Sequence, residues 1–224
     1  MLPLYEELML LALDEKKGTV IGSSSMALPY GLTAAVILEL LYKGKIICEM
    51  NKIILIDKIA TSEEILDEAI NIIARSNKIR EIKYWIEKLA NRIKNLNNRI
   101  LKNLVNKGIL KKEKHKFLFI PYNRYPENNP NPEQNIREKI QHILIFEQTP
   151  DERLLSLISL IKACELLNVI ISKEKRKIVR KRIKKLTKDE QIGHAVSEIV
   201  TQRRAALASS TTTVTLASIV TVTT

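Results

Sequence analysis

Two separate stretches of the sequence share one pattern: an apolar run at helical spacing, then Lys-Gly, then two short apolar stretches separated by a charged turn. The first is ILELLYKGKIICEMNKIILID, which begins at Ile37, and the second is RILKNLVNKGILKKEKHKFLFIP, which begins at Arg99. A glycine after a periodic apolar run is typical of a helix end, and paired short apolar runs across a turn are typical of a hairpin. The sequence therefore predicts a helix followed by a β-hairpin in two places, as in a winged helix.

The rest of the chain favours helices. Glycine and proline are scarce, at six and seven among 224 residues, and most other segments place apolar side chains at helical spacing. Two expected helices, Leu32 to Tyr42 and Thr149 to Ile171, are apolar nearly all round, which is typical of the centre of a bundle. We therefore expect a mainly α fold: a helical bundle with two short β-hairpins following helices.

A chain of this length fits a single domain, which we place at residues 1–204. Residues 205–224 differ from it in composition, because they are uncharged and rich in alanine, threonine and valine. Their many serine and threonine residues argue against a membrane-spanning segment. We expect this C-terminal tail to be an appendage of the domain.

The formal charge of +12 predicts attraction to polyanions, either nucleic acid or the anionic face of a membrane. The run from Lys173 to Lys188 is strongly basic, since only Glu174 interrupts its positive sign. This run is either a solvated helix face or a surface for an anionic membrane. Its interleaved residues are aliphatic, which argues against stacking on the bases of a single strand. Cys48 and Cys164 lie in apolar contexts and are expected to be buried reduced thiols, which fits a cytosolic location.

No catalytic constellation is evident in the sequence. His115, His142 and His194 are isolated from one another and from both cysteines, so no metal-ligand spacing occurs. Neither a nucleotide-binding loop, nor a dinucleotide fingerprint, nor a nucleophile elbow is found. We predict a protein that is not an enzyme and that has no metal and no cofactor.

The helix before each hairpin decides whether such a unit could read DNA. The helix before Gly44 is nearly all apolar and offers nothing to a base edge. The expected helix from Asn91 to Lys107 is different, because it carries arginine, lysine and asparagine side chains that pair with guanine and adenine edges. A nucleic-acid-binding, winged-helix-like protein that uses this second helix is therefore the alternative hypothesis.

Five segments, read in order, resemble the Golgi phosphoprotein 3 family. They are LYEELMLLALDEKKGT, LPYGLTAAVILELLYKGKI, ILDEAINII, RILKNLVNKGILKKEKHKFLFIP and DERLLSLISLIKACELLNVI. The resemblance runs from about Leu4 to Ser197. It implies a mostly helical domain with a central bundle and protruding hairpins. It also implies a peripheral membrane protein that binds phosphatidylinositol 4-phosphate and recruits cytosolic tails of membrane proteins.

The resemblance also implies where a lipid headgroup would bind. The family's pocket uses a tryptophan and an arginine that fall at Ser24 and Thr33 of this chain, and a later basic pair that falls at Lys94 and Asn97. Only Lys94 keeps the charge. Two further arginines on the same expected helix are close enough to substitute, so the predicted headgroup-binding residues are Lys94, Arg99 and Arg92.

The second hairpin, Ile109 to Ile120, resembles the one that family members use for membrane contact and self-association. We predict that Lys112, Lys114 and Phe117 face the membrane, with a plain structural hairpin as the other interpretation. The tail beyond Arg204 resembles bacterial members of the family, for which phosphatidylglycerol or cardiolipin would be the available anionic lipids.

The combined expectation is a cytoplasmic, peripherally membrane-associated, non-catalytic protein. Its expected partners are anionic lipids, the cytosolic tails of membrane proteins, and a second copy of the chain through the second hairpin. A third hypothesis is an adaptor whose main partner is a protein, with the charge serving only solubility.

Overall fold

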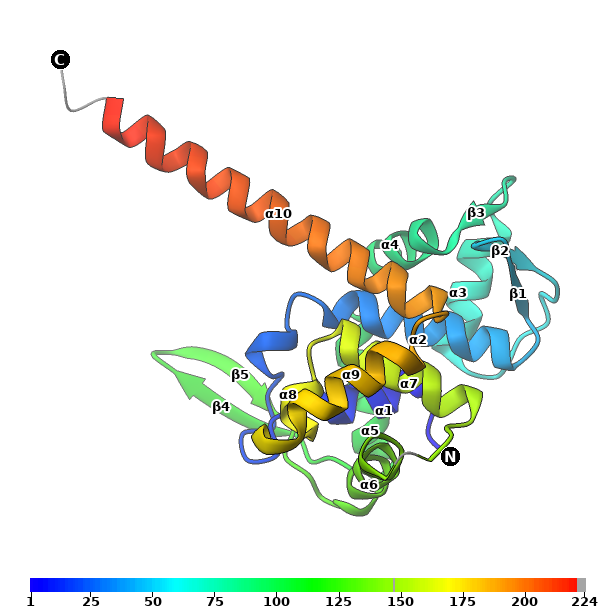
Figure 1. Cartoon of the computed structure of the whole chain (residues 1–224), viewed down its shortest axis with the longest axis horizontal. Coiled ribbons are helices and arrows are strands. Elements are labelled where there is room, and N and C mark those ends of the chain that lie inside the picture. Colours follow the sequence, from blue (N-terminus) through cyan, green and yellow to red (C-terminus); the bar gives the residue numbers. More distant parts are fainter. Residues whose placement is uncertain (147, 221–224) are drawn as a thin grey trace.

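The protein is a helical bundle from which two antiparallel hairpins and one long helix project (Figure 1). The structure is a computed structural model and describes residues 1–146 and 148–220, with side chains except at 117 and 209–220. The first half of the chain forms α1 (Leu4–Leu11), a 3₁₀ turn (Gly22–Ser24), α2 (Leu28–Tyr42), β1 (Ile46–Glu49), β2 (Lys52–Leu55), α3 (Glu64–Ala74), β3 (Arg80–Glu81), α4 (Ile82–Arg92) and α5 (Leu96–Asn106). The second half forms β4 (Glu113–Phe117), β5 (Ile120–Arg124), α6 (Asn131–Ile145), α7 (Glu152–Ala163), α8 (Leu167–Ile170), a 3₁₀ turn (Lys173–Lys175), α9 (Arg176–Leu186) and α10 (Gln191–Val220). The expected mainly α fold with two hairpins is confirmed.

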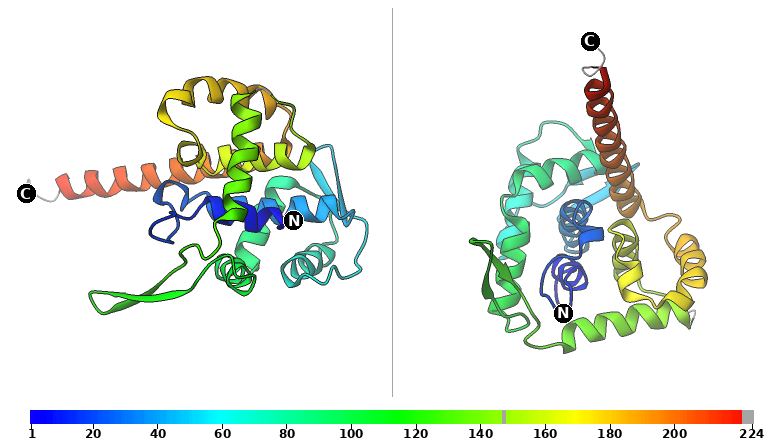
Figure 2. Two further views of the ribbon diagram at one scale, coloured as in Figure 1. Left: turned by 90° about the horizontal axis from the view of Figure 1, so that it is seen from below. Right: turned by 90° about the vertical axis from the view of Figure 1, so that its left-hand side faces the viewer.

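Helix α2 is the centre of the bundle. Residues 31–40 are buried on every side, including polar Thr33 and Glu39. Helices α1, α4, α7 and α10 pack around α2. Figure 2 shows α1 and α2 in the middle, with α3 to α5 on one side and α7 to α9 on the other. The expectation of a central second helix is confirmed, although the helix begins earlier, at Leu28.

Both Lys-Gly pairs end their helices in the same way. Gly44 and Gly108 adopt left-handed φ angles of 66° and 70°. At the first, the amide of Lys45 donates to Leu40 O (2.9 Å) and that of Gly44 to Leu41 O (3.0 Å). The amides of Ile109 and Gly108 repeat this pair of bonds after α5. These are Schellman caps, which direct the chain away from the helix into the hairpin.

The two hairpins differ in size. β1 and β2 pair in register from Ile46 opposite Leu55, and β3 adds a short third strand to β2 that the sequence pattern did not reveal. β4 and β5 form a two-stranded hairpin that extends away from the bundle. Both thiols are free: Cys164 is buried as expected, whereas Cys48 on β1 is only partly buried.

Two expected helices are interrupted. The predicted helix from Asn91 to Lys107 is wrong, because α4 and α5 are separated by a turn in which Asn95 adopts a left-handed φ of 55°. The predicted helix up to Ile171 also breaks after α7, where Glu165 has a φ of 60°. Asparagine tolerates this conformation better than most residues, but neither break contains a glycine or a proline. Apolar spacing continues across both breaks, so the pattern alone predicted unbroken helices.

Helix α10 is partly embedded and partly projecting. Its first turns bury four aliphatic side chains, which are Ile192, Val196, Ile199 and Val200. A Cβ on Gly193 would lie 1.8 Å from Ser159 Oγ, so α10 crosses α7 where only glycine fits. The helix then extends well beyond the bundle (Figure 1). Its backbone continues across residue 204, so the domain boundary expected there remains a prediction from composition. Among the described residues, none of the helices combines the length and hydropathy that crossing a bilayer requires.

Candidate functional site

The turn between α4 and α5 presents two of the three predicted headgroup-binding residues. Arg92 ends α4, and Lys94 lies in the turn itself; both side chains are exposed. The left-handed backbone at Asn95 breaks the helix immediately after Lys94. The two cations therefore lie at the junction of two helices, here called the Arg92–Lys94 corner, rather than along one continuous helix face.

Arg99, the third predicted residue, is engaged within the protein. It lies on α5 and forms ion pairs with two carboxylates of α3, with Glu64 at 3.1 Å and with Glu68. Its side chain is only 21% exposed. Two nearby anions offset its charge, so Arg99 is a weaker attractor for an external anion than Arg92 or Lys94.

The positions that the family's tryptophan and arginine would occupy are buried. The Ser24 hydroxyl donates to Ile21 O at 2.8 Å, and the side chain is fully enclosed. Thr33 is fully enclosed in α2, where its hydroxyl lies 3.0 Å from Tyr30 O and 3.3 Å from Ile86 O of α4. Asn97, on the first turn of α5, is partly buried. Of the four positions, only Lys94 offers an exposed charged group.

The β4–β5 hairpin ends in an exposed apolar tip. Leu118 and Phe119 form the turn, with positive φ angles of 44° and 71°. Their side chains are 76% and 98% exposed, and that of Ile120 is 68% exposed. A two-residue turn with both φ angles positive favours asparagine and glycine, so leucine and phenylalanine are costly here. The two residues that are strained in this turn, Leu118 and Phe119, are also apolar, and apolar side chains are favourable at a lipid surface.

The predicted membrane-facing residues lie along the same hairpin. Lys112 precedes β4, and Lys114 lies on the strand; both are exposed. Phe117 ends β4, but its side chain lies outside the described residues. Sequence reasoning missed Phe119 at the tip, although an apolar FLFI run at a hairpin turn was the available signal. Both views in Figure 2 place this hairpin on the same side of α1 and α2 as α5.

Helix α9 carries a second cluster of positive charge. Its buried side chains, Val179 and Ile183, anchor it on the bundle, where it packs against α6 and α7. Its exposed cations are Lys177, Arg180, Lys181, Lys184 and Lys185. Burial lowers the pKa of Lys162 on the neighbouring α7, and the charge of Lys184 lowers it further. The basic run that stood out in the sequence is therefore a surface feature, with Val179 and Ile183 turned inward and Ile178 exposed.

A group of buried carboxylates lies beneath the N-terminus of α1. Glu39 of α2 accepts from the amide of Leu4 (2.6 Å) and from the Arg153 guanidinium (2.7 Å). Glu7 lies 3.8 Å from the same guanidinium. Burial raises the pKa of Glu7 from its ordinary value of 4.5 to about 7. These interactions join α1, α2 and α7, and Glu7 and Arg153 also line a small pocket of about 70 Å³.

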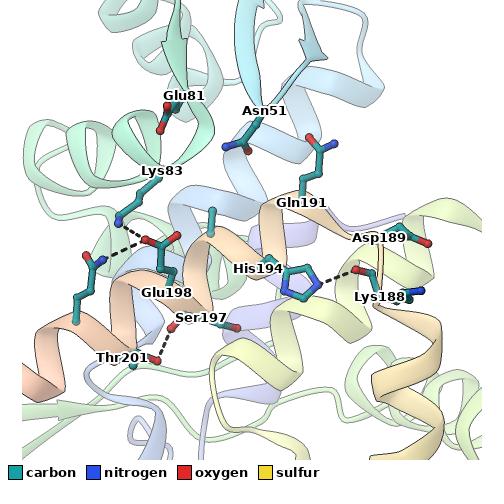
Figure 3. Close-up of a pocket in the computed structure, with 12 residues that line it drawn as sticks. Asn51, Glu81, Lys83, Lys188, Asp189, Gln191, His194, Ser197, Glu198 and Thr201 are labelled. Carbon is teal, nitrogen blue, oxygen red and sulfur yellow. Dashed lines mark hydrogen bonds and ion pairs between the residues drawn. The ribbon is translucent and has the colours of Figure 1, made fainter.

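A broad hollow of about 940 Å³ lies between α4, the β1–β2 turn and the start of α10 (Figure 3). The Lys83 ammonium in its wall pairs with Glu198 at 2.5 Å, and Gln202 donates to the same carboxylate. The His194 ring nitrogen lies 3.0 Å from two backbone carbonyl oxygens, those of Thr187 and Lys188. The histidine and the ion pair are thus occupied by contacts within the protein. No cluster of three possible metal ligands occurs in the described part of the chain.

Comparison with known proteins agrees with the resemblance found in the sequence. A similar protein is the Vacuolar protein sorting-associated protein 74 of Schizosaccharomyces pombe, with 27% identity over 166 residues. The alignment covers 64% of this chain and 48% of the yeast protein, so the chain spans about half the length of the curated relative that it matches. Because this relative is a yeast protein, it does not support the expected likeness to bacterial members.

The family match is broader than the alignment to this relative. Residues 4–203 match the family described as Golgi phosphoprotein 3 (GPP34), which takes in every element from α1 to the embedded part of α10. The chain therefore belongs to the Golgi phosphoprotein 3 family.

Proposed function

We propose that this protein is a non-catalytic peripheral membrane protein that binds anionic phospholipid headgroups. The observation that carries the proposal is the hairpin tip, where three neighbouring apolar side chains, Leu118, Phe119 and Ile120, are exposed beside a lysine-rich strand. Exposed apolar clusters of this kind mark interaction surfaces. An apolar tip with adjacent cations suits the boundary between headgroups and acyl chains.

The Arg92–Lys94 corner joins α4 to α5, which lie on the same side of α1 and α2 as the hairpin (Figure 2), so it adds charge on that side. Each basic side chain close to an anionic surface contributes about 1 kcal/mol to binding, so the corner and the hairpin lysines together give reversible attachment. We assign headgroup contact to Arg92 and Lys94. Arg99 is assigned a positioning role, because its charge is already paired with Glu64 and Glu68.

The proposed lipid selectivity follows from the buried positions. Family members bind phosphatidylinositol 4-phosphate, but Ser24 and Thr33 cannot contact a headgroup without leaving the core. We therefore propose recognition by charge density, with phosphatidylinositol 4-phosphate bound as one of several anionic lipids. A role as an adaptor for the cytosolic tails of membrane proteins, and self-association through the hairpin, belong to the same proposal.

The structure supports the nucleic-acid alternative less well than the membrane proposal. That alternative relied on one recognition helix from Asn91 to Lys107, whereas the chain forms two helices with a break at Asn95. α5 alone is a continuous helix before the hairpin, as a winged-helix reading head requires. Its Arg99, however, which would face a base edge in that hypothesis, is paired with carboxylates of α3.

Vesicle co-sedimentation at low ionic strength tests the proposed function. The wild type is compared on neutral vesicles, on phosphatidylserine vesicles, and on phosphatidylinositol 4-phosphate vesicles of matched charge. We expect binding to both anionic types and little to the neutral one. Arg92→Gln, Lys94→Gln removes two charges worth about 1 kcal/mol each and should reduce binding to both anionic types about thirtyfold. The matched control is Lys52→Gln, Lys78→Gln, which removes two exposed charges elsewhere.

Failure of the wild type to bind any anionic vesicle would refute the proposed function. Binding to phosphatidylinositol 4-phosphate alone would refute recognition by charge density. A duplex-DNA shift at the same salt concentration is the companion measurement, and tight DNA binding without vesicle binding would restore the alternative.

A further inference from the structure

The exposed cations of α9 form one continuous face. Lys177, Lys181 and Lys184 recur at spacings of four and three residues, so they lie above one another on the helix surface. Arg180 and Lys185 extend the face on either side, and all five side chains are exposed. None of the five forms an ion pair with any described carboxylate. Within the described part of the chain, no carboxylate therefore neutralises this face.

This arrangement is unfavourable for the helix by itself. Like charges at spacings of three and four residues repel one another, and no acidic residue occurs within α9 to offset them. The lowered pKa of Lys162, which has Lys184 as one of its causes, shows that the positive potential reaches the neighbouring helix. The helix stays in place because Val179 and Ile183 are buried beneath it.

The composition of the face indicates which polyanion it fits. Its exposed side chains are flexible cations and one aliphatic residue, Ile178, which is 68% exposed. It has no aromatic side chain for stacking on bases and no asparagine or glutamine for reading base edges. A convex row of lysines with an exposed isoleucine is suited to a layer of anionic headgroups, which demands charge but little stereochemistry.

The position of α9 separates it from the proposed headgroup site. Both views in Figure 2 show α9 on one side of the central α1 and α2, and α5 with the β4–β5 hairpin on the other. A single flat bilayer cannot contact both sides of a bundle at once. The two basic surfaces therefore cannot serve the same membrane from one molecule.

We propose that α9 is a second membrane-binding surface, so that the protein can join two anionic bilayers, one at α9 and one at the hairpin and the Arg92–Lys94 corner. The inference rests on the proposed function, because the first bilayer is the one bound there. Joining membranes is an additional activity, since a protein with a single membrane-binding surface would only coat a vesicle.

Vesicle clustering tests the inference independently of binding. The full chain is mixed with vesicles of phosphatidylserine and phosphatidylcholine at low ionic strength. Co-sedimentation measures binding, and dynamic light scattering measures clustering. The test variant is Lys177→Gln, Lys181→Gln, Lys184→Gln. The matched control is Lys52→Gln, Lys58→Gln, Lys78→Gln, which removes the same number of exposed charges from the β1–β2 region.

We expect the wild type and the control to bind and to cluster vesicles. The α9 variant is expected to bind through the hairpin side but to cluster vesicles at least about tenfold less efficiently. Its melting temperature should not fall, because the substitutions relieve repulsion on an exposed face.

Two results would overturn the inference while leaving the proposed function standing: binding by the wild type without clustering, or clustering by the α9 variant equal to that of the wild type. Loss of all binding in the α9 variant would overturn the inference and also the assignment of the first membrane to the hairpin side. Loss of DNA binding in the α9 variant with unchanged clustering would identify α9 as a nucleic-acid surface instead. Absence of any binding by the wild type would refute the proposed function as well.

Discussion

Arg99 and Glu7 show how the surroundings of a charged side chain decide its behaviour. Arg99 follows Arg92 and Lys94 closely in the sequence. Its guanidinium, however, is paired with Glu64 and Glu68. Those carboxylates belong to α3, about thirty positions earlier in the chain. A tertiary contact of this kind has no signature in the sequence around Arg99. The same holds for Thr33, whose burial depends on how α2 packs against α4.

Glu7 predicts a pH dependence of stability. Burial disfavours its charged form, so its pKa rises from 4.5 to about 7 on folding. The native state therefore holds a proton that the unfolded chain releases. The stability that this proton contributes is complete below about pH 4.5 and is lost as the pH rises to about 7. Glu7→Gln keeps the side chain neutral at every pH.

We expect Glu7→Gln to resemble the wild type near pH 4 and to be more stable at pH 8, by up to about 3 kcal/mol. Urea unfolding at several pH values measures this difference. The control is Glu49→Gln, an exposed position at the end of β1. Equal pH profiles for the wild type and Glu7→Gln would contradict the prediction.

At the scale of the elements, the helix ends were predictable and the helix interruptions were not. Gly44 and Gly108 are recognisable because the left-handed conformation strongly selects glycine. Asn95 and Glu165 adopt the same conformation without glycine, inside stretches whose apolar spacing continues. Neither break has a local breaker residue, so local sequence offered little warning of them.

Gly108→Ala tests the cap after α5. No atom lies within 4 Å of the position that a Cβ would occupy, so only the left-handed φ of 70° opposes the substitution. We expect a loss of about 1 to 2 kcal/mol in the free energy of unfolding. Gly22→Ala is the control, because that glycine also has open space but lacks a positive φ. Similar losses for both variants would show that the cap is not responsible.

The β4–β5 turn gives the opposite expectation. Leu118→Asn, Phe119→Gly supplies the residues that both left-handed φ angles favour. Amide exchange in the hairpin should slow, corresponding to a gain of about 1 kcal/mol or more in local stability. Affinity for anionic vesicles should fall, because the apolar tip is removed. A variant that retains full vesicle affinity would show that the tip does not contact lipid.

At the scale of the whole molecule, charge predicts how attachment responds to salt. The net charge of +12 acts through exposed side chains, and the screening length falls from about 10 Å at 0.1 M salt to about 3 Å at 1 M. We expect vesicle affinity to fall at least about tenfold over that range and to reach a residual level set by the apolar tip. Co-sedimentation across a salt series measures both. Affinity that does not change with salt would contradict electrostatic attachment.

The two ends of helix α10 differ in how they are held. Its inner turns are fixed by buried aliphatic residues and by the crossing with α7, where Gly193 leaves no room for a side chain. Residues 201–208 are exposed, but Arg203 pairs with Glu87 of α4 and Arg204 with Glu165 after α7. The inner turns can therefore be altered only together with α7, whereas a substitution on the outer turns changes surface ion pairs and leaves the core packing as it is. A single continuous helix thus has one end locked by steric fit and another held by charge.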